Sequence, residues 1–303
     1  MSTVDPKRHA AELARHLRVP PGEQVDLRHS HDPQRTYAVK DRAEAASNLA
    51  HSVVLLAELQ ERLAAQASNG VLLVLQGLDA SGKDGTIKHV MTGVNPQGVD
   101  VHSFKVPSVE ELAHDWMWRY QRAAPSRGRV CIFNRSHYEE VLVVRVHPEL
   151  LRRELDGGTG KVTDDTWRRR FEAINDWEHH LDESGVRVVK VLLHISRREQ
   201  ARRFLQRIDK QQKNWKFSDA DIAEHRYYDD YQAAFSAMLS ETSTRWAPWH
   251  VVPADHKWYA RLATSAVLIE ALDKLDPQYP KIDPAVQARM LAARPDLEAE
   301  LKG

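Results

Sequence analysis

A glycine-rich loop with one lysine and two aspartates has the residue types and the spacing for phosphate chemistry. The strand-like residues Val71–Gln76 lead into the segment Gly77–Thr86, which reads GLDASGKDGT. A strand followed by glycine, four residues, glycine and lysine, and then by a helix-like stretch, is typical of a phosphate-binding loop. In such a loop, backbone N–H groups and the N-terminus of the next helix hold phosphate oxygens, and the lysine adds a mobile positive charge.

Each residue of this loop has an expected role. We expect Lys83 to contact the transferred phosphoryl group, and Asp79 to bind Mg²⁺ or Mn²⁺ directly or through water. Asp84 stands where serine or threonine usually binds the metal, so the loop departs from the common form. The other expected phosphate contacts are Gly77, Ala80, Ser81, Gly82, Gly85 and Thr86, together with Asp84. A glycine-rich strand-to-helix turn with a surface lysine is the alternative.

A second strand-like segment also ends in polar residues. Residues Arg129–Phe133 are followed by NRSHYEEV, which begins at Asn134. Because ligands bind at the carboxyl ends of the strands in α/β sheets, Asn134 and Arg135 are candidate catalytic residues. Asn134 replaces the usual metal-binding aspartate and offers a neutral carbonyl oxygen to a metal, while Arg135 can clamp phosphate with its planar fork. Alternatively, the two residues only cap the next helix and pair with its acids.

The segment Arg197–Lys216 is rich in basic residues. Those that share one helical face are Arg198, Arg202, Arg203, Arg207 and Lys210. Within the segment only Glu199 and Asp209 oppose them, in a chain of zero formal net charge, which favours an external anion. Nucleotide kinases carry a mobile lid at this place, whose closure excludes water and brings positive charge to the transferring group. The alternative is a solvated helix face whose charges pair with acids.

The composition limits the possible classes of protein. The 303 residues are 42% hydrophobic and 28% charged, which is typical of a globular protein. The first residues lack an apolar signal segment, no apolar run approaches the ~20 residues of a membrane span, and Cys131 is the single cysteine. We therefore expect a cytoplasmic protein with no membrane partner. The histidines lack metal-binding spacing, and only Trp215 lies among many basic residues, so we expect no nucleic-acid partner.

Strand-like and helix-like segments alternate through the middle of the chain. The expected strands are Val71–Gln76, Val99–Phe104, Arg129–Phe133, Val186–Ile195 and His250–Pro253. The expected helices are Lys83–Thr92, Val109–Gln121, Ser136–Val146, Thr163–Glu183, Arg197–Asn214, Ala220–Ser240 and Lys257–Leu275. Gly157–Gly160 predicts a turn. This alternation predicts three α/β/α layers with a five-stranded parallel sheet, and with the loop at Gly77–Thr86 it indicates a phosphate-loop kinase fold. We expect an N-terminal helical extension (1–66), a phosphate-loop kinase domain (67–275) with a helical lid at about 197–225, and a C-terminal tail (276–303).

Together these motifs resemble the polyphosphate kinase 2 family. The resemblance rests on Gly77–Thr86, on FNRSHYEEVL at Phe133–Leu142 and on the basic segment that ends at Lys216, and it covers roughly Arg42–Leu275. It implies a fold like that of thymidylate kinases, and reversible phosphoryl transfer between inorganic polyphosphate and nucleotides with Mg²⁺. The second motif, in its Asn-Arg-Ser-His-Tyr-Glu version, resembles the subgroup that phosphorylates both AMP and ADP, which gives ADP and ATP.

The resemblance also assigns roles to residues of this sequence. It makes Asp79 and Asn134 metal-associated, Lys83 the loop lysine and Glu139 a determinant of nucleotide choice. The expected polyphosphate path consists of Arg198, Arg202, Arg203, Arg207 and Lys213. Family analogy and the apolar faces of the N-terminal helices also predict a homo-oligomer. Two alternatives stay open: an ATP-dependent nucleoside monophosphate kinase, and a polyphosphate- or nucleotide-binding protein without catalysis, in which Asn134 marks a lost metal site.

Overall fold

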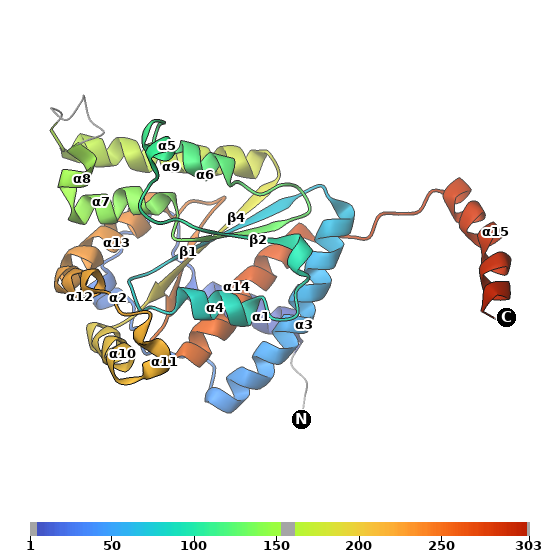
Figure 1. Ribbon diagram of the computed structural model, residues 1–303, viewed down its shortest axis with the longest axis horizontal. Helices are drawn as coiled ribbons and strands as arrows, with labels where there is room; N and C mark the ends of the chain where they lie inside the picture. The colour runs from blue at the N-terminus through green and yellow to red at the C-terminus, as the bar shows by residue number, and fades with distance from the viewer. Residues whose placement is uncertain (1–4, 153–160, 302–303) are drawn as a thin grey trace.

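A parallel β-sheet forms the centre of the computed structural model, which describes residues 5–152 and 161–301 (Figure 1). Within these residues five strands are ordered β2-β3-β1-β4-β5. Their bounds are β1 (Gly70–Gln76), β2 (Val99–Ser103), β3 (Val130–Asn134), β4 (Val186–His194) and β5 (Trp249–Pro253). Each end lies within one residue of its predicted position, so the predicted α/β class and parallel sheet are confirmed.

Helices cover both faces of the sheet and create two hydrophobic cores (Figure 1). Leu72 and Val74 of β1 belong to one core, while Val71 and Leu73 belong to the other. The first core lies under α9 (Asp164–Glu183) and α13 (Tyr228–Thr242). The second lies under α1 (Pro6–Leu17), α3 (Arg42–Gln66), α4 (Lys83–Val90) and α14 (Lys257–Leu275). Because both faces are covered, β1 is apolar almost throughout instead of alternating with polar residues.

Several predicted helices are interrupted. The predicted helix Val109–Gln121 is divided between α5 (Val109–Leu112) and α6 (Trp118–Arg122), because the Asp115 carboxylate accepts from the Met117 N–H at 2.9 Å and turns the chain. The predicted helix Ser136–Val146 is divided into η2 (His137–Val141) and α7 (Val143–Val146), and Arg197–Asn214 is divided into α10 (Arg197–Asp209) and α11 (Gln211–Asn214). The predicted helix Ala220–Ser240 is divided into α12 (Asp219–Glu224), η4 (His225–Tyr227) and α13. The remaining short elements are α2 (Leu27–Ser30), η1 (Pro96–Gly98) and α8 (Pro148–Arg152).

The N-terminal helices are packed into the body of the molecule. Both α1 and α3 contact α14. The apolar face of α1 is buried, and its members are Ala10, Leu13, Ala14 and Leu17. The chain therefore covers this face itself, and the face offers no free surface to a second copy. The expected homo-oligomer stays a prediction, but this part of its basis is removed.

The last helix, α15 (Pro284–Glu300), stands apart from the body at the end of a connecting segment (Figure 1). The structure describes every residue of α15, and none of them is buried. Across the described ranges, no helix combines the length and the apolar character that crossing a membrane requires. The turn predicted at Gly157–Gly160 falls outside the residues that the structure describes.

Candidate active site

The loop Gly77–Thr86 connects β1 to α4 at the carboxyl edge of the sheet. Gly77 has a φ of +148°, and a Cβ at this position would lie 2.8 Å from both the Leu193 carbonyl oxygen and Ser81 Oγ. Gly82 has a φ of +109°, which residues with a side chain rarely adopt. Backbone geometry therefore requires both glycines of the motif, as a phosphate-binding loop predicts.

Lys83 is almost fully buried at the start of α4, with 8% of its surface exposed. Its Nζ donates to the carbonyl oxygens of Gly77, at 2.5 Å, and Leu78, at 3.2 Å. Burial, followed by the nearby charge of Arg135, lowers the pKa of Lys83 to about 8. The surface-lysine alternative is therefore wrong. Neutral carbonyls do not cancel the ammonium charge, so a phosphate oxygen is a favourable further partner.

Arg135 belongs to the second motif and reaches the phosphate loop. Because β3 runs beside β1, with Asn134 opposite Leu75, the two motifs meet at the sheet edge. The Arg135 guanidinium pairs with Asp79 and, at 3.3 Å, with Glu139. Burial alone would lower the pKa of Arg135, but the two carboxylates outweigh burial and raise it. Arg135 has a left-handed φ of +63°, which its surroundings must hold in place.

Asn134 and Asp84 join the two motifs directly. Asn134 Nδ2 donates to Asp84 Oδ1 at 3.0 Å, and Lys216 Nζ lies 3.4 Å from Asp84 Oδ2. Burial opposes these partners, yet they lower the pKa of Asp84. The capping alternative does not hold for Asn134, because the side chain that caps η2 belongs to Ser136. Asp84 thus connects the second motif to the basic segment.

Arg203 is buried and supports the phosphate loop through hydrogen bonds. Its guanidinium donates to the loop carbonyls of Ala80, at 2.9 Å, and Ser81, at 2.6 Å. It also donates to the carbonyls of Ala254, at 2.5 Å, and Asp255, at 3.1 Å, after β5. Its Nε donates to Glu199 at 2.7 Å. Arg203 therefore fixes the shape of the loop, and its donors are already engaged by the protein.

The other basic residues of α10 and α11 divide into two groups. Arg198 and Arg202 are exposed and lie outside the groove that the phosphate loop lines, and Arg202 pairs with Glu199. Arg207 and Lys213 do line this groove. Arg207 pairs with Asp221 of α12, an acid outside the segment considered in the sequence. Part of the expected charge excess is therefore compensated within the chain.

A groove of about 420 Å³ opens beside the phosphate loop. Of the described residues, nine basic and two acidic ones line it, and the acids are Asp79 and Asp84. The basic residues are Lys83, Lys105, Arg135, Arg203, Arg207, Lys213, Lys216, Lys257 and Arg261. Sequence reasoning assigned no role to Lys105, Lys216, Lys257 or Arg261. The available signals were the position of Lys216 in the basic segment and the four-residue spacing of Lys257 and Arg261 at the start of α14.

A second, smaller pocket of about 30 Å³ shares Asp79 and Arg135 with the groove. Glu139 lines this pocket but not the groove. The remaining lining is acidic, polar and apolar, and consists of Gln76, Gly77, Leu78, Leu142, Val143, Gln200, Glu224, Tyr231 and Phe235. A basic groove and a less basic pocket thus meet at the Asp79–Arg135 pair.

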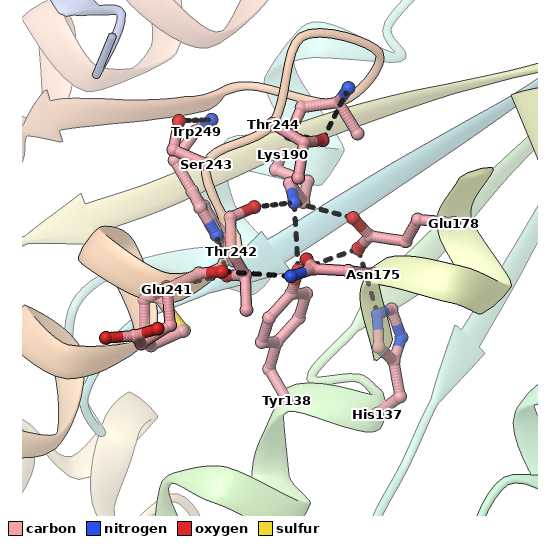
Figure 2. A network of polar contacts seen from close by, with 12 residues as sticks. His137, Tyr138, Asn175, Glu178, Lys190, Glu241, Thr242, Ser243, Thr244 and Trp249 are labelled. Atoms are coloured by element: carbon pink, nitrogen blue, oxygen red, sulfur yellow. Dashed lines mark hydrogen bonds and ion pairs between the residues drawn. The ribbon is translucent and has the colours of Figure 1, made fainter. Parts of the chain in front are cut away.

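A buried polar network lies behind the second motif (Figure 2). Lys190 on β4 and Glu178 on α9 form an ion pair at 2.6 Å, and neither side chain is exposed. Lys190 Nζ also donates to Tyr138 Oη at 2.9 Å and to the Thr242 carbonyl at 2.6 Å. Glu178 Oε1 accepts from Tyr138 Oη at 2.7 Å and lies 3.1 Å from His137 Nε2. The network thereby anchors the second motif to the sheet, to α9 and to the end of α13.

The parallel sheet, the phosphate loop and the basic groove define a phosphotransferase of the phosphate-loop kinase class. The sequence matches the family model of Polyphosphate kinase 2 over residues 39–280. The chain belongs to the polyphosphate kinase 2 family, as its motifs predicted.

Individual relatives agree with this assignment. The chain is 45% identical over 282 residues to the ADP-polyphosphate phosphotransferase of Rhodopseudomonas palustris, and this match covers 93% of this chain and 97% of that one. It is 42% identical over 269 residues to the AMP/ADP-polyphosphate phosphotransferase of Meiothermus ruber, and this match covers 88% of this chain and 96% of that one. The crystal structure of polyphosphate kinase 2 from Arthrobacter aurescens TC1 matches with a TM-score of 0.83 at 40% identity, over 92% of this chain and 96% of that chain.

Proposed function

We propose that this protein transfers phosphoryl groups reversibly from inorganic polyphosphate to AMP and ADP, and that the reaction requires Mg²⁺. The observation that carries the proposal is the groove beside the phosphate loop, where nine basic residues face two acids. A polymeric phosphate donor suits a long row of cations, whereas ATP carries only three phosphates. The names of the relatives from Rhodopseudomonas palustris and Meiothermus ruber support polyphosphate as donor and AMP and ADP as acceptors.

In the proposed mechanism, the terminal phosphates of the donor bind the loop N–H groups, Lys83 and Arg135. We assign the acceptor nucleotide to the Glu139 side of the Asp79–Arg135 pair, where the smaller pocket of about 30 Å³ has to widen to admit it. A phosphate oxygen of the acceptor attacks the terminal phosphorus in line, and the shortened polyphosphate leaves. Because the acceptor phosphate is already ionised at neutral pH, positioning and charge neutralisation suffice without a strong general base.

The oxygen ligands near the loop fit a magnesium ion that keeps most of its water and phosphate ligands. Asp79 supplies a carboxylate, and Asn134 turns its amide nitrogen to Asp84, so its carbonyl oxygen is the ligand that it can offer. Within the described ranges no group of three or more His, Cys, Asp or Glu side chains is gathered for a metal. Mg²⁺ commonly uses only one or two protein carboxylates beside substrate phosphates. When bound, the ion neutralises negative charge on the transferring phosphates.

One experiment separates this proposal from both alternatives. The protein is incubated with Mg²⁺, long-chain polyphosphate and either AMP or ADP, without ATP, and the nucleotides are separated by chromatography. We expect ADP and ATP to form. Product that appears only when ATP is the donor would indicate a nucleoside monophosphate kinase, and binding without any product would indicate a non-catalytic protein.

The assembly and the domain division stay proposals as well. We propose a homo-oligomer, which sedimentation at several concentrations tests. We also propose that residues 197–225 act as a lid on the kinase domain, with 1–66 as its helical extension. Limited proteolysis tests the lid, since substrate should protect it from cleavage if closure occurs.

A further inference from the structure

Two basic side chains of α14 lie in the groove but outside every motif. Lys257 and Arg261 are four residues apart in the first turns of α14, so they share one face of the helix, and both line the groove with Ala260 between them. Figure 1 shows α14 beside α4, the helix that begins at the phosphate loop, and the two helices pack together. The fold therefore brings these cations to the phosphate site from the far end of the sequence.

Across residues 5–152 and 161–301, neither Lys257 nor Arg261 has a hydrogen-bond or ion-pair partner. Of the charged groups that act most strongly on the pKa of Lys257, Arg203, Lys213 and Arg202 are basic and Glu199 is acidic. Burial and these cations lower the pKa of Lys257 to about 8, and burial and Arg42 lower that of Arg261. Like charges held together in this way favour binding of an anion.

These cations lie apart from the point of transfer. Asp79 and Arg135 line both the groove and the smaller pocket, whereas Lys257 and Arg261 line the groove alone. A donor whose terminal phosphate lies at the Asp79–Arg135 pair therefore meets Lys257 and Arg261 with phosphates farther along its chain.

We propose that Lys257 and Arg261 form a subsite for the distal phosphates of the polyphosphate donor and thereby favour long chains over short ones. This inference rests on the proposed function. The terminal phosphates occupy the loop, and the chain leaves along the α14 side of the groove. Arg42, at the start of α3, adds a further positive charge near Arg261.

The test compares two donors, long-chain polyphosphate and tripolyphosphate, in the full-length protein. For the double variant Lys257→Gln/Arg261→Gln we expect the KM for long chains to rise about tenfold or more, since a hydrogen bond to a charged group is worth roughly that factor. The KM for tripolyphosphate should rise much less. Calorimetric titration with the same two donors measures the difference in binding affinity without turnover.

Lys274→Gln is the matched control, because it removes one positive charge from the other end of α14, where Lys274 pairs with Glu270. It should leave the ratio of the two KM values unchanged. Thermal unfolding of the double variant shows whether it is folded, and the two single variants repeat the test if it is not. An equal rise for both donors, or no rise, would overturn the subsite. Failure of the wild-type protein to use any polyphosphate would instead overturn the proposed function.

Discussion

At the scale of single residues, the site neutralises many of its charges before any phosphate is bound. Arg135 pairs with Asp79 and Glu139, and Lys216 lies 3.4 Å from Asp84. Lys83 differs, because its direct hydrogen-bond partners are backbone carbonyls. Of these three basic residues, Lys83 is therefore the one most ready to donate to a phosphate oxygen.

Replacing Lys83 by methionine tests its role. We expect Lys83→Met to reduce kcat by about 100-fold or more, because groups aimed at developing phosphate charge have effects of this size. The fold should persist, since methionine leaves no charged group in a buried position. Turnover is measured with polyphosphate and ADP, and circular dichroism checks the fold. Activity near that of the wild type would exclude Lys83 from the reaction.

The lowered pKa of Lys83 predicts a pH dependence. Burial lowers the pKa of the free enzyme to about 8, so the ammonium form that binds phosphate is lost as the pH rises through about 8. We expect kcat/KM for polyphosphate to fall above this pH. Bound phosphate raises the pKa again, so kcat should fall only at higher pH.

The pKa of Lys257 is also lowered to about 8, so a control is needed. The fall in kcat/KM should persist in Lys257→Gln if Lys83 is its source. Its disappearance in that variant would assign the fall to Lys257 instead.

Residue identities were predictable where backbone geometry fixes them, and less so where packing decides. The spacing of Gly77, Gly82 and Lys83 reveals a phosphate loop because the turn itself demands it. Helical spacing placed Arg202 and Arg203 in one basic segment but could not separate them. Their difference, one exposed and one buried, follows from the packing of α10 against the loop.

At the scale of elements, Arg203 connects α10, the phosphate loop and the turn before α14. We expect Arg203→Met to lower the free energy of unfolding by about 3 kcal/mol, because it leaves several buried carbonyls without a charged donor. It should also raise the KM for polyphosphate, since the loop loses its support. Chemical denaturation and donor titration measure the two effects.

The neighbouring Arg202 is a matched control. Its side chain is 58% exposed, and its partner Glu199 keeps the ion pair with Arg203, so Arg202→Met should change the free energy of unfolding by no more than about 1 kcal/mol. Equal losses of unfolding free energy in the two variants would contradict the structural role of Arg203.

The Lys190–Glu178 pair ties β4 to α9 and supports the second motif. We expect Lys190→Met to lower the free energy of unfolding by about 3–5 kcal/mol, because it leaves the Glu178 carboxylate buried without its cation. The double variant Lys190→Met/Glu178→Leu should lose less than the single one, since no buried charge remains. A double-mutant cycle by urea denaturation measures the difference. Additive losses would show that the two residues do not act as a pair.

Strands were predicted more accurately than helices for a physical reason. A buried parallel strand is a short apolar run, which the sequence displays directly. Helix ends depend on side-chain caps such as Asp115, and on breaks such as Lys210, whose backbone is extended between α10 and α11. Such local competition leaves little trace in apolar periodicity.

At the scale of the whole molecule, the groove exists only when the complete fold has formed. Its cations come from the phosphate loop, the second motif, the segment after β2, α10 to α11, and α14. The two motifs and the basic segment Arg197–Lys216 identify three of these sources in the sequence. Lys257 and Arg261 lie outside the motifs, and they reach the groove because α14 follows β5 and packs against α4.

The isolated position of α15 predicts that it can be removed. A chain that ends at residue 283 should keep its turnover and stay within about 0.5 kcal/mol of the full-length free energy of unfolding, because no residue of α15 is buried. The family match also ends before α15, at residue 280. A chain that ends at residue 267 is the contrasting control and should not fold, since it lacks the buried residues Leu268, Ile269 and Leu272. Loss of turnover or of self-association in the first truncation would assign α15 a role.

The internal ion pairs of the site make donor binding an exchange of partners. When polyphosphate takes Arg135 and Lys216, the carboxylates of Asp79, Glu139 and Asp84 lose cations that now offset their charge. Those freed carboxylates then favour a divalent cation, so polyphosphate and the cation should bind cooperatively. Thermodynamic linkage requires each ligand to strengthen the other by the same factor. The protein would then hold either ligand weakly alone and both firmly together.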